Sequence, residues 1–417
     1  MQAKDQRMEL SVAGILMMVS LAASLSLPGG YQLGAAIFVV MGLIRLWQRL
    51  LAHAPLQEPT LAGKLPLFLV GFAIVGALVS FWHSEPSGHY ELFIPFLWAP
   101  LIFLAVLDGQ IDRRYVWIGC LFGAALACMI AVYQSMWIGV ERPSGFLNSP
   151  IFFGNNVLLL GSVALAGRHD PPFNLKRSVW LALAYAGFLL GVTASLVSLS
   201  KGGWPFALLI LAWVMIEDLR RSTKREWRSL VLIVLACAAL LSLLPSDKIL
   251  DRINSALVGA TEWFRTGEMV EGSVAPRLEL WKLGVMIWPE KPWLGHSREG
   301  VTEKIQETTS FGGGYPVFSD IGALHSESIQ LLAEKGLAGL LGWLIMYISS
   351  ALVFWCAYSS FKPSEKTIGQ AGIFTLAGSF VFGLSDTYLM WNVNRQIFVF
   401  IVMTIAAILL VERKSSP

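Results

Sequence analysis

Long apolar runs separated by short polar segments recur along the chain. A helix that crosses a lipid bilayer needs about 20 mostly apolar residues. Runs of this kind lie near residues 10–27, 31–47, 63–82, 91–107, 115–139, 150–166, 178–198, 204–217, 229–245, 336–358, 367–385 and 392–412. Only helices and closed barrels satisfy every backbone polar group inside a membrane. The pattern therefore predicts an all-α polytopic membrane protein with about 12 transmembrane helices.

One polar stretch, at about residues 245–322, is much longer than the other connections. Loops of this length in compact proteins are usually functional. Residues 273–288 within it carry an apolar stripe at helical spacing that includes Leu280 and Trp281, which is typical of a helix on a membrane surface. We divide the chain into residues 1–245 with transmembrane helices 1–9, the loop region 246–322, and residues 323–417 with the catalytic-motif helix and transmembrane helices 10–12.

Lys and Arg concentrate in alternate connections, such as residues 220–228. The excess of positive charge marks the cytoplasmic side, so both termini are predicted to be cytoplasmic and the long loop to lie on the opposite face. The short outer connections carry Arg142, Lys201 and Arg395, three cations on the face that usually excludes them. The net charge of +3 follows from topology and gives no indication of a nucleic-acid partner.

His325 is the first candidate for chemistry, because it stands where the polar loop meets a hydrophobic span. Histidine titrates near neutral pH and can take a proton from a hydroxyl group. We expect His325 to be a catalytic base. The alternative is an interfacial histidine that hydrogen-bonds to a neighbour.

Four cations are predicted to share the outer face with His325, namely Arg142, Lys201, Arg265 and Arg277. Arg277 opens the predicted loop helix, and helix N-termini favour anions. Glycines beside Arg142 and Lys201 allow a ligand to approach the backbone closely. Cations that converge in this way can hold a diphosphate without a metal. The alternative is a set of interfacial or solvated charges.

Several familiar sites are missing from the outer connections. They contain no Asp-x-Asp pair for a divalent metal, no His-Glu-x-x-His zinc motif and no Gly-x-Ser-x-Gly nucleophile. We therefore expect no metal and no cofactor in the reaction. Asp386 and Arg395 flank the last outer turn, where we expect them to pair with each other or else to complete the site.

Five short motifs follow one another between residues 142 and 336. They are Arg-x-x-Gly-Phe at 142–146, Ser-Lys-Gly-Gly at 200–203, Arg-x-x-x-Trp at 277–281, Pro-Trp-Leu-Gly at 292–295 and His-Ser-x-x-x-x-x-Leu-x-Glu-x-Gly at 325–336. Over most of residues 130–400 the sequence resembles the O-antigen ligase and polymerase superfamily of bacterial inner-membrane glycosyltransferases. The segment at 325–336 is the most specific of these motifs.

The resemblance implies an enzyme of lipopolysaccharide biosynthesis in the bacterial inner membrane. Its reaction would transfer a glycan from undecaprenyl diphosphate to the lipid A-core oligosaccharide on the periplasmic face. His325 would be the general base, and Arg277, with Arg142, Lys201 and Arg265, would bind the diphosphate. Lys201 stands where many relatives carry arginine, so a forked contact is lost there. A single displacement would invert the anomeric centre.

Two kinds of alternative remain at this point. An O-antigen polymerase or a protein O-oligosaccharyltransferase of the same superfamily would use the same donor with another acceptor. The long loop between spans nine and ten favours the ligase, because polymerases often carry a second large loop between earlier spans. A polyprenyl-lipid transporter is the alternative from another class. Transporters usually place ionisable groups near the membrane midplane, whereas the candidates here gather at the outer rim.

Overall fold

The computed structural model describes residues 11–55, 60–221, 246–267, 274–310 and 322–415, and all regular elements within them are helices. The α-helices are α1 (Val12–Ala23), α2 (Gly30–Leu51), α3 (Leu61–Trp82), α4 (Ile94–Leu97), α5 (Ala99–Asp108), α6 (Arg113–Met136), α7 (Pro150–Ala166), α8 (Arg177–Val197), α9 (Trp204–Arg221), α11 (Ser246–Thr266), α12 (Ala275–Ile287), α13 (Ser297–Ser310), α14 (Glu327–Tyr358), α15 (Pro363–Ser385) and α16 (Asn392–Ser415). The short 3-10 helices are η1 (Ser87–Leu92), η2 (Gly167–His169), η3 (Lys201–Gly203), η4 (Trp288–Glu290) and η6 (Tyr388–Met390).

Nine of the described helices are long and apolar enough to cross a membrane, namely α2, α3, α6, α7, α8, α9, α14, α15 and α16. The α1 helix and the α4–α5 pair are apolar but shorter, and they occupy the expected first and fourth spans. The expected ninth span, at residues 229–245, lies outside the described residues. The chain is an all-α polytopic membrane protein, as predicted, while the total of about 12 spans stays a prediction.

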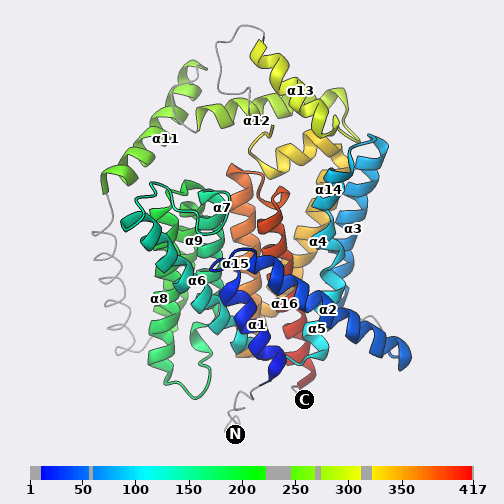
Figure 1. Cartoon of the computed structure of the whole chain (residues 1–417), viewed down its shortest axis with the longest axis vertical. Coiled ribbons are helices and arrows are strands. Elements are labelled where there is room, and N and C mark those ends of the chain that lie inside the picture. The colour runs from blue at the N-terminus through cyan, green and yellow to red at the C-terminus, as the bar shows by residue number, and fades with distance from the viewer. Residues whose placement is uncertain (1–10, 56–59, 222–245, 268–273, 311–321, 416–417) are drawn as a thin grey trace.

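The α16 helix forms the centre of the bundle, and its apolar segment is completely buried. It packs against α15, α5 and α3, with α14 on the far side of α15 and α3 (Figure 1). Aromatic rings fill the contacts, as where Phe400 of α16 meets Phe38 of α2 edge to face at 5.3 Å. The helices that carry the candidate site, α14 and α15, therefore rest on a tightly packed core.

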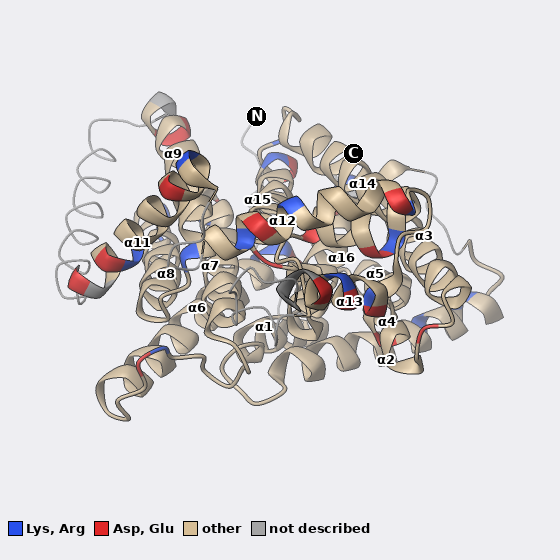
Figure 2. Ribbon diagram, turned by 90° about the horizontal axis from the view of Figure 1, so that it is seen from above, with Lys and Arg blue, Asp and Glu red and all other residues tan. Residues whose placement is uncertain are grey.

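Three helices, α11, α12 and α13, form a layer over one end of the bundle (Figure 1). The predicted loop helix at 273–288 is confirmed as α12. Part of its apolar face packs against the protein, because Leu280 and Ile287 are buried in a cluster with Val301, Leu324 and Ala333, whereas Val285 is exposed. Seen from above in Figure 2, α12 lies over the bundle, and it packs against α14.

A kink at Gly336 in α14 joins this layer to the bundle. Gly336 has φ 63° and ψ −160°, which breaks the helical hydrogen-bond ladder. The segment before α13 restores the lost bonds: His296 N donates to Ala333 O at 2.8 Å, and Leu337 N donates to Pro292 O at 2.8 Å. The Pro-Trp-Leu-Gly motif at 292–295 thus packs against the Glu-x-Gly end of the motif at 325–336.

The opposite end of the bundle is held by buried ion pairs. Arg168, which is fully buried, places its Nη2 atom 2.8 Å from Asp218 and 2.9 Å from Glu217 of α9. Arg113 likewise bridges Asp170 and Glu412. Removing one partner of such a pair leaves an uncompensated buried charge and is strongly destabilising, so these pairs fix the ends of α6, α7, α9 and α16.

Candidate active site

His325 lies in a tight turn directly before α14. Its φ of 51° is uncommon for a residue other than glycine, and two contacts hold it there. Leu324 N donates to Gln330 Oε1 at 2.5 Å, and Trp281 Nε1 of α12 donates to His325 O at 3.2 Å. The imidazole is about one-third exposed, with 31% of its surface accessible. The backbone is therefore fixed by both α12 and α14 while the ring remains open to a ligand.

Asp386 at the end of α15 is the partner of His325. Its Oδ1 atom lies 3.3 Å from His325 Nδ1 and also accepts a 2.8 Å hydrogen bond from Thr387 N. A carboxylate beside Nδ1 favours the tautomer with hydrogen on that atom and leaves Nε2 as the basic nitrogen. Within the described residues Nε2 of His325 has no hydrogen-bond partner. The histidine and carboxylate thus have the arrangement that a general base requires.

The expected ion pair between Asp386 and Arg395 is wrong. Arg395 turns away and donates to Met390 O at 2.7 Å and to Glu91 O at 3.4 Å. Backbone carbonyls of the turn and of η1 thus accept from its two Nη atoms, while its Nε atom is buried without a hydrogen-bond partner among the described residues. Asp386 is consequently left to face His325.

Four cations from four separate elements gather beside this pair. Arg142 comes from the α6–α7 connection, Lys201 from η3, Arg252 from α11 and Arg277 from α12. Burial, together with the positive charges of Arg252 and Arg277, lowers the pKa of Arg142, and nearby Glu141 opposes the shift. Lys201 Nζ lies 3.5 Å from Arg252 O, and the charges of Arg252, Arg277 and Arg142 all act on it. We call these four residues the cation cluster.

Arg277 links the cation cluster to the histidine. Burial lowers the pKa of Arg277, and the negative charge of Asp386 opposes that shift. The carboxylate that contacts His325 is therefore close enough to act on Arg277. This electrostatic interaction connects the cation cluster to the His325–Asp386 pair.

Within the part of the chain that the structure describes, the cation cluster forms no ion pair with a carboxylate. Among the described residues no carboxylate forms an ion pair with Arg142, Lys201, Arg252 or Arg277, and Arg142 Nε is buried without a hydrogen-bond partner. Like charges held together in a half-buried site are unfavourable unless a ligand supplies the opposite charge. Arginine and lysine are the residues that bind phosphate groups. The arrangement suits an anionic ligand rather than a metal ion.

The two connections that carry Arg142 and Lys201 are themselves fixed. Gln134 Nε2 donates to Gly145 O at 2.8 Å, and Gly145 N donates to Gln134 Oε1 at 2.9 Å. Gly145 has φ 60°, a conformation that glycine adopts without strain. In the other connection, Ser200 Oγ donates to Pro150 O at 2.6 Å. These bonds hold the connection with Arg142 against the end of α6 and the connection with Lys201 against the start of α7.

Arg265 does not join the cation cluster. It lies at the opposite end of α11 from Arg252, about 20 Å along the helix at about 1.5 Å per residue. Its side chain is 72% exposed, and Nη2 lies 3.1 Å from Glu262. This geometry agrees with a solvated charge, the alternative considered for the cations above.

Sequence reasoning missed Arg252 and the role of Asp386. Arg252 lies in no recognisable motif, and its helix, α11, is strongly amphipathic. Helical spacing alone would have placed it on the polar face with several other charges. Asp386 follows α15, 61 residues after His325, and no local pattern connects the two positions.

Comparison with known proteins agrees with the motifs. A family model described as O-antigen ligase matches residues 186–344, a range that includes Lys201, Arg252, Arg277 and His325. No curated protein sequence matches the chain. The matched range covers α9, the layer of α11–α13 and the kinked start of α14, where most of the site residues lie. Residues 186–344 are therefore similar to the O-antigen ligase family.

Proposed function

We propose that the protein is an O-antigen ligase, which transfers a glycan from undecaprenyl diphosphate to the lipid A-core oligosaccharide. The observation that carries this proposal is the meeting of the His325–Asp386 pair with four cations that have no carboxylate partner among the described residues. A base beside an anion site is what transfer from a diphosphate-linked sugar requires. The family match supports a glycosyltransferase that acts on lipid-linked glycans.

The reaction is a single displacement at the anomeric carbon. His325 Nε2 takes the proton from an acceptor hydroxyl as its oxygen forms a bond to that carbon. The bond between the carbon and the diphosphate oxygen breaks, and undecaprenyl diphosphate leaves with the bonding electrons. Attack from the face opposite the leaving group inverts the anomeric configuration. Asp386 holds the ring in the required tautomer and stabilises the imidazolium that forms.

The cation cluster stabilises the leaving group. Negative charge grows on the diphosphate as the bond breaks, and Arg142, Lys201, Arg252 and Arg277 lie around the space where this charge would develop. Fixed positive charges in a half-buried site need no reorganisation during the reaction. The cluster can therefore do the work that a divalent metal does in many diphosphate enzymes. We leave Arg265 outside the proposed site because it is exposed and paired with Glu262.

The proposed site faces the periplasm. The layer of α11–α13 lies at the end of the bundle opposite the connections rich in Lys and Arg, such as Arg113, Arg114 and Arg168. Positively charged connections mark the cytoplasmic side of an inner-membrane protein. Both termini are then cytoplasmic, and the glycan acceptor is reached on the far side of the membrane.

The product of the reaction tests this function against its alternatives. Purified protein would be reconstituted in liposomes with undecaprenyl-diphosphate glycan and lipid A-core. We expect lipid A-core capped with glycan. Lengthened lipid-linked glycan would instead indicate a polymerase, and glycan attached to an added acceptor protein would indicate a protein glycosyltransferase. Movement of the lipid between leaflets without any new glycosidic bond would indicate a transporter.

A further inference from the structure

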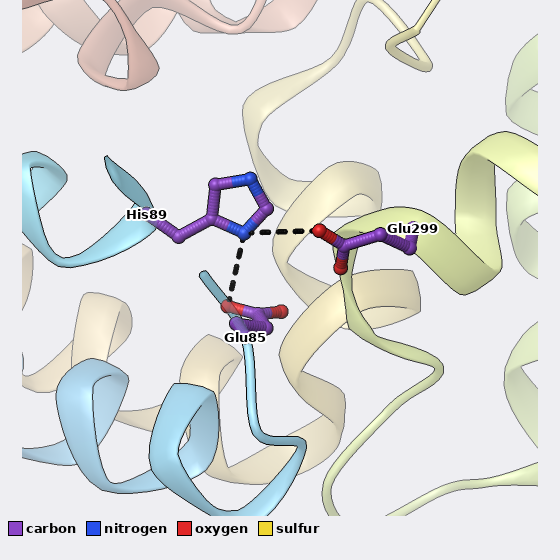
Figure 3. A group of neighbouring side chains, drawn as sticks. All are labelled: Glu85, His89 and Glu299. Atoms are coloured by element: carbon purple, nitrogen blue, oxygen red, sulfur yellow. Dashed lines mark ion pairs between the residues drawn. The ribbon is translucent and has the colours of Figure 1, made fainter. Parts of the chain in front are cut away.

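A second polar cluster lies outside the proposed active site, where η1 meets α13. Figure 3 shows His89 of η1 between Glu85, which follows α3, and Glu299 in the first turn of α13. His89 Nδ1 lies 3.5 Å from Glu85 Oε2 and 3.6 Å from Glu299 Oε1. We propose that these three side chains bind a zinc ion that fastens the outer helical layer to the bundle.

The spacing of the three atoms fits a shared ion better than direct contacts. Both distances are too long for good hydrogen bonds, and His89 Nδ1 is buried without a hydrogen-bond partner. All three ligand atoms lie within 4.8 Å of one another. Zinc binds imidazole nitrogen and carboxylate oxygen at about 2.0–2.2 Å, so the ligands of a tetrahedral site lie about 3.4 Å apart. The separations of 3.5 and 3.6 Å are close to that value.

Glu85 is prepared to act as a ligand. Its side chain is only 1% exposed, Lys335 Nζ lies 2.6 Å from Oε2, and Arg298 N donates to Oε1 at 3.1 Å. These two contacts fix the orientation of the carboxylate, as residues around a metal site commonly do for its ligands.

The ligand set indicates which ion the site would take. One imidazole with two carboxylates favours zinc over magnesium or calcium, which prefer oxygen ligands alone. A water molecule would complete four-coordination on the side of Glu299, whose carboxylate is about half exposed. Lys335 shares an oxygen with the proposed ion and repels it. We therefore expect weaker binding than at zinc sites built from cysteines.

The ion would have a structural role. Glu85 follows the outer end of α3, Glu299 belongs to α13, and Lys335 belongs to α14 immediately before the Gly336 kink. The proposed site therefore joins α13 to the bundle beside the segment that restores the hydrogen bonds of α14. None of its three ligands belongs to the His325–Asp386 pair or to the cation cluster. The inference consequently stands apart from the proposed reaction.

The test measures metal content and thermal unfolding of the full-length protein in detergent. The protein would be stripped with a chelator, supplied with zinc, freed of excess metal and analysed by mass spectrometry. We expect about one zinc ion per chain, with a melting temperature that rises with zinc concentration. His89→Ala and Glu299→Gln should each lose both the bound zinc and the zinc-dependent rise.

Glu303→Gln is the matched control, because Glu303 is an exposed carboxylate one turn after Glu299 on the same helix. It should retain zinc like the natural sequence. Glu299→Gln changes a half-exposed side chain, so its metal-free form should melt close to the metal-free natural protein, which separates loss of metal from loss of folding. A natural protein that retains no zinc, or variants that retain it in full, would overturn the proposed site.

Discussion

Asp386 Oδ1 lies 3.3 Å from His325 Nδ1, although the two residues are 61 positions apart in the chain. The contact joins the end of α15 to the turn before α14. The negative charge of the same carboxylate also acts on Arg277 of α12. One acidic residue therefore touches the proposed base and acts on the proposed diphosphate site. Asp386 therefore interacts with both parts of the proposed site, the base His325 and the cation cluster.

Asp386→Asn should slow glycan transfer, because the amide cannot stabilise an imidazolium as the carboxylate does. We expect a loss of about 10²-fold or more, within the range of general-base contributions. The rate should be measured alone and in combination with His325→Ala. If Asp386 acts through His325, the second substitution will cost little once the first is present. Equal costs in both backgrounds would contradict the proposed role.

Arg252→Ala and Arg265→Ala form a matched pair on α11. Arg252 acts on Arg142 and Lys201 of the cation cluster, whereas Arg265 is exposed and pairs with Glu262. A lost contact to a charged ligand typically costs about 1.5–3 kcal/mol, so Arg252→Ala should reduce kcat/KM for the lipid donor by about 10–100-fold. Arg265→Ala should leave it within about twofold, as expected for an exposed surface charge. The reverse order of effects would remove Arg252 from the site.

Lys201→Arg tests whether charge or shape matters at η3. The lysine supplies a point charge, and arginine would add a forked donor at the same position. We expect Lys201→Arg to keep at least the natural rate of transfer and Lys201→Gln to lose about 10-fold or more. Donor titrations at low and high salt would show whether the loss is electrostatic. A Lys201→Gln variant with an unchanged rate would contradict phosphate binding at this position.

Gly336→Ala should destabilise the protein. The residue has φ 63°, which costs about 1–3 kcal/mol for a residue with a side chain, and a Cβ atom would collide with the Trp293 carbonyl. Gly342→Ala is the control within the same helix, because its Cβ would meet neighbours at ordinary distances of 3.6–3.7 Å. That change should be neutral or stabilise by up to about 1 kcal/mol. Thermal unfolding of the two variants checks the prediction, which fails if they melt alike.

Much of the fold was predictable because membrane spans have a strong local signal. The apolar runs identified helices such as α3, α14 and α16, and the helix at 273–288 was found from its own periodicity. The packing of α12 was not predictable. The buried partners of Leu280 include residues of α13 and of the turn that contains His325. The sequence contains no sign that these three segments meet.

The candidate site was predictable where a residue type was unusual for its place. Lys201 and Arg142 drew attention as cations on the outer face, and His325 as a histidine at a membrane boundary. Arg252 was hidden among the other charges of an amphipathic helix. Asp386 was expected to pair with Arg395 because the two lie close in sequence, but Arg395 donates to the carbonyl groups of Met390 and Glu91. A contact between residues that are distant in the sequence, such as His325 and Asp386, depends on how the helices pack. The pattern of charges along the chain does not predict it.

The most direct test of the central claim compares the natural protein with His325→Ala in the liposome assay, with EDTA present and below the unfolding temperature. His53→Ala serves as the control, because His53 is exposed at the end of α2. We predict that the natural protein and His53→Ala cap lipid A-core at equal rates without free metal, and that His325→Ala is slower by about 10²–10⁴-fold. Full transfer by His325→Ala would contradict the assignment of the base, and with it the proposed mechanism.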